Sequence, residues 1–266
     1  MKIGFIGSGA MGEALVKGLI DSGRYSPEDI CCSDILKTRC GFLSTTYGVS
    51  AHRDNIKVVE SSDIIILAVK PDKVREVVLE VKGIIDKTKL LVSIAAGVST
   101  NAIETWLDKD VPVIRVVPNT PCVIGKGISA IAPGKYSTEL HQEKAQDIFA
   151  CVGDTVRVSE SLMDAVTGVS GSGPAYIYLV IEAMIDAAVT VGLPRTAAAD
   201  LVLKTVIGSA EMVLQTGQHP AVLKAQVVSP GGTTAAGLNE LESGKLRALF
   251  TGAVKAAVQR AGELGE

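Results

Sequence analysis

The sequence predicts an α/β domain followed by an all-helical domain. Through roughly the first 160 residues, short apolar runs alternate with helical patterns, and each run is apolar on both faces as a buried parallel strand requires. From about Leu162 onward no strand pattern remains, and long apolar stretches follow helical spacing. We therefore expect one domain over residues 1–161 and a helical domain over residues 162–266.

The first apolar run, Ile3–Ile6, ends in a glycine-rich turn that opens a helix. In a G-x-G-x-x-G turn the first glycine makes the bend, the second lets a pyrophosphate approach the backbone, and the third allows close packing. The N-terminus of the helix then offers free N–H groups to the phosphates. The turn predicts a Rossmann-type dinucleotide-binding domain, with cofactor contacts from Gly7, Ser8, Gly9, Ala10, Met11 and Gly12.

An acidic residue follows the second predicted strand, Ile30–Ser33. Asp34 lies about 20 residues beyond the glycine turn, where the ribose contact is expected. Asp34 favours NAD, because a carboxylate accepts the ribose 2′-hydroxyl and repels a 2′-phosphate. Ser33, Lys37 and Arg39 could instead bind that phosphate, or the two cations could lie on a solvated face. The choice between NAD and NADP therefore stays open.

Later strands end in loops of mostly small or polar residues. In an open parallel sheet, ligands bind outside the carboxyl ends of the strands, so we expect the nicotinamide near these loops, although each could also be an ordinary connection. The three strands are Ser62–Val69, Leu90–Ile94 and Val113–Val117. The far edge of the sheet is expected from strands Gly127–Ala132 and Thr155–Val158, with a helix over Thr138–Ala150 between them.

The helical half begins with a stretch, Ala175–Leu193, that is apolar nearly all round. A domain of about one hundred residues can hardly bury such a helix alone, so we expect a second subunit to cover it. The stretch is about long enough to span a bilayer, but Glu182 and Asp186 in its middle argue against a membrane span. Further helices are expected over Arg195–Gln215, Ala221–Val228, Thr234–Leu241 and Lys245–Leu264.

Composition excludes several classes of function. The formal net charge is −3, and no basic run or aromatic-interleaved patch indicates a nucleic-acid partner. The five cysteines lack C-x-x-C spacing and the three histidines lack ligand spacing, so we expect reduced thiols and no metal site. The sequence opens on its first strand without a signal-peptide pattern, so we expect a cytoplasmic protein.

Two glycine-rich segments interrupt the helical half, Thr167–Pro174 and Ser229–Thr234. Each could present free N–H groups at a helix N-terminus to a carboxylate, or could be an interhelix turn capped by serine and threonine. Neither segment contains a strong acid or base. A carbonyl reductase normally needs a positioned proton donor, whereas a protonated imine is already electrophilic and needs less help.

Several motifs together resemble the Δ1-pyrroline-5-carboxylate reductase family over essentially the whole chain. They are Phe5–Gly9, Ala68–Pro71, Ala95–Val98, Asn119–Pro121, Asp164–Gly168, Ser170–Tyr176, Ser229–Thr234 and Leu241–Gly244. The resemblance implies an N-terminal dinucleotide domain and a helical domain that forms interlocking homodimers, which often assemble further into rings. It implies that NAD(P)H donates a hydride to the C=N carbon of pyrroline-5-carboxylate to give L-proline, the last step of proline biosynthesis.

The resemblance also assigns site residues. Thr234 matches the threonine that hydrogen-bonds the substrate nitrogen. The loop that holds the substrate carboxylate corresponds to Ser229, Gly231, Gly232 and Thr233, and the segment beside nicotinamide and substrate corresponds to Ser170, Gly171 and Ser172. The loops around the cofactor correspond to Val69, Lys70, Pro71, Ala95 and Asn119. This chain departs from many members at two positions. It has Ala225 where the segment before Ser229 often carries an acid, and Asp34 where many members have a small polar residue.

Two other interpretations are less favoured. A β-hydroxyacid dehydrogenase would carry a catalytic lysine in the first long helix of its second domain, and Ala175–Leu193 contains none. A non-catalytic dinucleotide-binding regulator would be expected to lose Thr234 or the paired glycines, and the chain retains both. The imine reductase is the favoured hypothesis.

Overall fold

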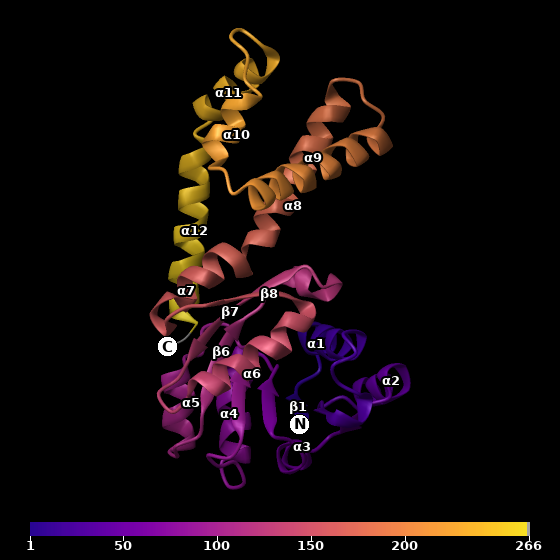
Figure 1. The fold of residues 1–266 in the computed structure, drawn as a ribbon, viewed down its shortest axis with the longest axis vertical. Helices are drawn as coiled ribbons and strands as arrows, with labels where there is room; N and C mark the ends of the chain where they lie inside the picture. The colour runs from indigo at the N-terminus through magenta and orange to yellow at the C-terminus, as the bar shows by residue number, and fades with distance from the viewer. Residues whose placement is uncertain (265–266) are drawn as a thin grey trace. The chain divides into compact units, whose positions relative to one another are not determined.

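The computed structural model describes residues 1–264, and its elements are labelled in Figure 1. The chain forms two compact units. The first consists of Met1–Ser172 together with the end of the chain from Ala256, and the second is Gly173–Lys255. The domain boundary predicted at residues 161 and 162 stays a prediction.

The first unit is built on an eight-stranded sheet in the order β3-β2-β1-β4-β5-β6-β7-β8. Neighbouring strands are parallel except for the antiparallel pair β6 and β7. The strand order reverses beside β1, and this is the position at which open α/β sheets bind ligands. The strands are β1 Ile3–Ile6, β2 Ile30–Ser33, β3 Ser50–His52, β4 Ile64–Leu67, β5 Leu90–Ser93, β6 Val113–Val117, β7 Gly127–Pro133 and β8 Gly153–Arg157.

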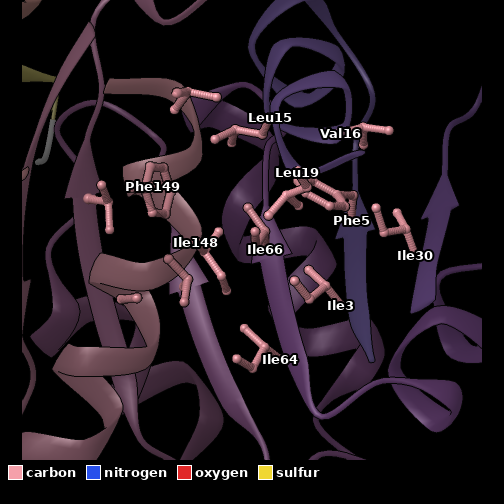
Figure 2. Close-up of a cluster of buried hydrophobic side chains, with 14 of the residues drawn as sticks. Ile3, Phe5, Leu15, Val16, Leu19, Ile30, Ile64, Ile66, Ile148 and Phe149 are labelled. Atoms are coloured by element: carbon pink, nitrogen blue, oxygen red, sulfur yellow. The ribbon is translucent and has the colours of Figure 1, made fainter. Parts of the chain in front are cut away.

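Helices cover both faces of this sheet because alternate strand residues point to opposite faces. On one face, Phe5 and Ile66 pack with Leu19 of α1 and Phe149 of α6 (Figure 2). On the other face, Ile65 and its neighbours pack against α3, α4 and α5. The helices of this unit are α1 Ala10–Asp21, α2 Lys37–Tyr47, α3 Asn55–Ser61, α4 Pro71–Val81, α5 Thr100–Leu107, α6 Glu139–Phe149 and α7 Met163–Val166.

The strands and the longer helices agree closely with the sequence predictions, and β1, β2 and β6 have the predicted ends. The strand predicted over Ser62–Val69 is shorter, since only Ile64–Leu67 pairs with its neighbours. Three elements, β3, α3 and α4, were not predicted from the sequence. Pro71 occupies the first turn of α4, where its missing N–H costs nothing.

The second unit is entirely helical in the described residues, as predicted. Helices α8 and α9 pack against each other after a reversal at Gly192, whose φ is 102°. No residue of α8 is buried within the chain, and Tyr178 and Leu179 are 59% and 65% exposed. The helices are α8 Gly173–Thr190, α9 Arg195–Thr216, α10 Pro220–Gln226, α11 Thr233–Ser243 and α12 Leu246–Glu263, the last of which continues into the first unit.

One helical stretch of the described chain, Glu160–Thr190, is long and apolar enough by composition to cross a membrane. Core helices of soluble proteins meet the same criterion. Two of its charged side chains, Glu182 and Asp186, lie in α8, and the latter accepts a hydrogen bond from Arg195 at 2.7 Å. The apolar exterior of α8 is therefore interrupted by charge and fits better against protein than against lipid.

A buried arginine joins strand β6 to the segment that leads into the helical half. The side chain of Arg115 is 3% exposed and lies 3.0 Å from Glu160 and 3.3 Å from Asp164. Glu160 also accepts a hydrogen bond from the backbone N–H of Thr100 at the start of α5. The charge of Arg115 is thus balanced by carboxylates from outside its own strand.

We expect Arg115→Met to lower the free energy of unfolding by about 3 kcal/mol, because it leaves two adjacent carboxylates without their buried cation. Urea denaturation at fixed protein concentration, followed by the fluorescence of the sole tryptophan, Trp106 on α5, would measure this. The matched control is Arg157→Met on β8, which removes a more exposed pair with Glu139 and should cost at most about 1 kcal/mol. Equal losses in the two variants would contradict this account.

Candidate cofactor and substrate sites

The glycine turn between β1 and α1 has the shape that a dinucleotide requires. Gly7 has a φ of +89°, and a Cβ there would lie 2.7 Å from the carbonyl oxygen of Ala68. A Cβ on Gly12 would lie 2.9 Å from the carbonyl oxygen of Gly7, so only glycine allows this close packing. A Cβ on Gly9 would meet no atom within 4 Å. The space beside Gly9 is therefore open for a ligand to approach the backbone.

The start of α1 presents unpaired backbone donors beside this space. The first helical hydrogen bond runs from the N–H of Glu13 to the carbonyl of Gly9 at 2.9 Å. The N–H groups of Ala10, Met11 and Gly12 consequently have no acceptor in the described chain, and no side chain caps the helix. Free N–H groups at the positive end of a helix suit a pyrophosphate.

Asp34 is tied to the glycine turn and keeps acceptor capacity. Its Oδ2 accepts a hydrogen bond from the N–H of Ser8 at 3.1 Å, and its Oδ1 accepts from the N–H of Leu36 at 2.9 Å. Each carboxylate oxygen can accept more than one hydrogen bond, so a ribose hydroxyl could still be bound. The carboxylate lies at the carboxyl end of β2, next to the turn, as the sequence predicted.

The side chain of Ser33 is not positioned to bind a 2′-phosphate. Its side chain is 1% exposed, and its hydroxyl donates to Oδ1 of Asn55 at 2.7 Å. The carbonyl of Ser33 accepts from the N–H of Gly7 at 2.9 Å and from the hydroxyl of Ser8 at 3.2 Å. Ser33 therefore supports the glycine turn from beneath, and its hydroxyl is not turned toward a cofactor.

Arg39, the second candidate for binding a 2′-phosphate, is already engaged. Its guanidinium bonds to Glu13 at 2.5 Å and to the carbonyl of Ser8 at 2.5 Å. Tyr47 donates to the other oxygen of Glu13 at 2.8 Å. Burial raises the pKa of Glu13, but the hydrogen bonds from Arg39 and Tyr47 outweigh it and bring the pKa below its usual value. The sequence alone gave no sign of this role for Glu13, because an acid in the first turn of a helix is common for its favourable interaction with the helix dipole.

The loops after β4, β5 and β6 lie along the same edge of the sheet, because these strands are paired in parallel register. Val69 and Lys70 follow β4 directly, and Pro71 begins α4. The side chain of Ala95 after β5 is 3% exposed, so only its backbone can face a ligand. Asn119 accepts a hydrogen bond from the N–H of Ile128 at 3.0 Å and points its amide nitrogen at the hydroxyl of Ser170, 3.4 Å away.

The segment around Ser170 is helical, which corrects the loop predicted over Thr167–Pro174. Thr167–Gly171 forms a π-helical turn between α7 and α8. The N–H of Ser172 donates to the carbonyl of Thr167 at 2.8 Å, so it is not a free donor for a carboxylate. Single π-helical turns are frequent at functional sites because the wider turn alters which side chains and carbonyls the helix presents. Gly171 and Ser172 complete this turn within the first unit, next to Asn119.

The Ser229–Thr234 segment of the second unit is a turn that opens α11. Gly231 has a φ of +68°, and a Cβ on Gly232 would lie 2.2 Å from the hydroxyl oxygen of Ser229. Gly232 caps the helix without any side-chain hydrogen bond, and the N–H of Ala236 is the first to bond within the helix, to the Gly232 carbonyl. Within the described residues, the N–H groups of Thr233 and Thr234 are therefore free. This geometry supports an anion cradle rather than a turn capped by serine or threonine.

The described residues contain free cysteines and no cluster of metal-ligating side chains. All five cysteines are free, and burial raises the pKa of Cys32 to about 12. Among residues 1–264, no three side chains of His, Cys, Asp or Glu gather as they would around a metal ion. The candidate sites consist instead of backbone donors, hydroxyls and the carboxylate of Asp34.

Comparison with known proteins assigns both halves of the chain. A family model described as pyrroline-5-carboxylate reductase dimerisation matches residues 160–264, and one described as NADP oxidoreductase, coenzyme F420-dependent, matches residues 2–97. The pyrroline-5-carboxylate reductase of Methanosarcina acetivorans is 47% identical over 100% of this chain and 98% of its own length. That of Arabidopsis thaliana is 43% identical over 100% of this chain and 96% of its own length.

Solved structures agree with the sequence relatives. The pyrroline-5-carboxylate reductase of Coxiella burnetii is similar with a TM-score of 0.93 and 39% identity, covering 100% of this chain and 98% of its own. The enzyme of Plasmodium falciparum, solved with NADP bound, is similar with a TM-score of 0.91 and 34% identity over the same shares. By sequence and structure over its whole length, the chain belongs to the pyrroline-5-carboxylate reductase family.

Proposed function

We propose that this protein uses a nicotinamide dinucleotide to reduce the C=N bond of pyrroline-5-carboxylate, giving L-proline in the last step of proline biosynthesis. The observation that carries the proposal is the combination of two backbone cradles in a member of this family. The cradle at Gly7–Gly12 fits a pyrophosphate and the cradle at Ser229–Thr234 fits a carboxylate. When bound, the dinucleotide supplies the hydride that the imine carbon accepts.

Each cradle has a separate task. The N–H groups of Ala10, Met11 and Gly12 hold the pyrophosphate, and Asp34 accepts from the adenosine ribose. Contacts toward the nicotinamide half of the cofactor come from Val69, Lys70, Pro71, Ala95 and Asn119. Because α4 and the strand ends fix these loops, the cofactor would be held by elements that the sheet already orders.

The substrate is held by the second cradle and by hydroxyls. Ser229, Gly231, Gly232 and Thr233 bind the substrate carboxylate, while the hydroxyl of Thr234 hydrogen-bonds the ring nitrogen. From the family resemblance we also propose Ser170, Gly171 and Ser172 as substrate-binding residues. A hydroxyl is sufficient at the nitrogen, since an imine that arrives protonated needs orientation rather than proton donation.

We further propose a homodimer formed through the helical unit, with dimers able to assemble into a ring, and residence in the cytoplasm. The exposed apolar side chains of α8, including Ile177, Tyr178 and Leu179, support the first point, because a single chain leaves them in water. The domain boundary at residues 161 and 162 belongs to this proposal as well, since it separates the dinucleotide-binding residues from the helical region.

Adding pyrroline-5-carboxylate to the purified protein should oxidise NADH or NADPH with formation of L-proline, because both cradles are present in one chain. Absorbance at the reduced-nicotinamide band and chromatographic identification of proline would measure this. The control omits the imine. If cofactor binds but neither reduced nucleotide is oxidised, the protein would be a dinucleotide-binding regulator rather than a reductase.

Thr234→Ala should lower turnover by roughly five- to a hundredfold, since a lost hydrogen bond costs about 1–3 kcal/mol in the transition state. The dissociation constant of the reduced cofactor should stay nearly unchanged. Thr234→Ser keeps the hydroxyl and is the matched control, which should restore most of the rate. A parallel loss of cofactor affinity would refute the assigned role.

Gly9→Ala should weaken binding of the reduced cofactor by at least about tenfold, or about 1.4 kcal/mol, because the added methyl occupies the space open to the pyrophosphate. Thermal stability should be unaffected, since the methyl meets no protein atom within 4 Å. The matched control is Gly41→Ala in α2, where a Cβ also has open space. Unaltered binding in the first variant, measured by titration of nucleotide fluorescence, would rule out this cradle.

A further inference from the structure

We propose that Glu13 biases this protein toward NADH over NADPH by pairing with the guanidinium of Arg39 beside the ribose pocket and neutralising its charge. This inference rests on the proposed function, because it concerns the same dinucleotide site. Glu13 is a positioning residue here, since it acts through Arg39 and does not itself contact the cofactor.

The guanidinium of Arg39 is held from several sides. Nη2 lies 2.5 Å from Oε2 of Glu13, and Nε donates to the carbonyl of Ser8 at 2.5 Å. The guanidinium carbon also lies 5.0 Å from the centre of the Phe42 ring. The side chains of Arg39 and Glu13 are 23% and 27% exposed, so solvent only partly screens their attraction.

Glu13 is itself fixed by a second donor. The hydroxyl of Tyr47 donates to Oε1 of Glu13 at 2.8 Å, which leaves Oε2 for the arginine. The ring of Tyr47 meets that of Phe42 edge-on, with the centroids 6.1 Å apart. Arg39 near the start of α2 and Tyr47 at its end therefore both bind the carboxylate of Glu13 on α1 and fix its position.

The ion pair of Glu13 and Arg39 lies at the ribose pocket, because Arg39 and Asp34 both form hydrogen bonds with the backbone of Ser8. Asp34 accepts from the N–H of Ser8 at 3.1 Å, while Arg39 donates to the carbonyl of the same residue. An acid at this place binds a ribose 2′-hydroxyl, whereas a nearby arginine accommodates a 2′-phosphate. This pocket contains both an acid, Asp34, and an arginine, Arg39. The nucleotide preference therefore depends on which of the two side chains is less engaged by other protein groups.

The charge balance favours the nucleotide without the phosphate. Glu13 offsets the charge of Arg39, so the negative charge of Asp34 remains uncompensated beside the ribose. Lys37, at the start of α2, is exposed to solvent, and Arg53 donates to the carbonyl of Ile35 at 3.1 Å. A 2′-phosphate would approach the carboxylate of Asp34 while one of the two candidate cations, Arg39, is already paired with Glu13 and the other, Lys37, stays solvated, whereas a 2′-hydroxyl would find an acceptor.

Equilibrium binding of NADH and NADPH to the purified full-length protein, without imine, tests the inference. The unmodified protein should bind NADH at least about fivefold more tightly. Glu13→Gln keeps the size of the side chain but removes its charge, and it should strengthen NADPH binding by about tenfold while changing NADH binding by less than about twofold. Glu60→Gln on the exposed face of α3 is the matched control and should leave both affinities alone.

A double-mutant cycle asks whether Glu13 acts through Arg39. In an Arg39→Ala background, Glu13→Gln should no longer change the ratio of the two affinities. Tyr47→Phe, which loosens Glu13 without removing it, should shift the ratio in the same direction by a smaller factor. If Glu13→Gln fails to fold by circular dichroism, the Tyr47→Phe result decides.

Tighter binding of NADPH by the unmodified protein would overturn the inference. So would an equal effect of Glu13→Gln on both nucleotides, or a shift that persists without Arg39. Turnover assays separate this from the proposed function. Imine reduction with an NADPH preference would overturn only the inference, and an NADH preference without imine reduction would overturn only the proposed reaction. Binding of neither nucleotide would overturn both.

Discussion

The close approach of Gly7 to the end of β4 is the constraint on which the first unit depends. A side chain at Gly7 would stand 2.7 Å from the carbonyl oxygen of Ala68, so β1 and β4 can reach this spacing only with glycine there. The same turn aims α1 back across the sheet, where Leu15 and Leu19 enter the core cluster (Figure 2). Packing and ligand geometry therefore come from one bend in the backbone, and the free N–H groups at the start of α1 follow from it.

Ser8, within that bend, connects the phosphate cradle to the ribose pocket. Its N–H is held by Asp34, its carbonyl by Arg39 and its hydroxyl by the carbonyl of Ser33. Because these bonds use the backbone of the glycine turn, a change in the charges around Ser8 would alter the position of the turn as well as the local potential. This is why the ion pair of Glu13 and Arg39 affects the cofactor although neither residue belongs to the glycine motif.

The helical unit follows a different physical logic. Its helices leave large apolar side chains in water, and Tyr178, Leu179 and Leu201 are each more than half exposed. So small a unit cannot cover that area by itself, and association with another subunit is the usual remedy. The Ser229–Thr234 turn needs no such help, since its geometry is set locally by the positive φ of Gly231 and the close contact of Gly232 with Ser229. The conformation of this turn is therefore set locally, whereas the exposed apolar area of the helices is explained by assembly.

Local pattern was enough to predict the Rossmann-type sheet, the glycine turn, the acid at Asp34 and the helical second half. Each of these depends on residues close together in the sequence, such as an apolar run bounded by glycine or a helical repeat. The tertiary structure decided which residues that are distant in the sequence contact each other. Ser33 faces Asn55 because β2 places it inside the sheet, and Arg39 reaches Glu13, 26 positions earlier, only because α1 and α2 are neighbours. The three-residue strand β3 forms by pairing with β2. The segment Thr167–Gly171 forms a π-helical turn, although its glycines and serine are equally compatible with a loop. The sequence alone therefore determined which groups were available, and the fold determined which of them were already engaged, because long-range pairing carries no local periodicity.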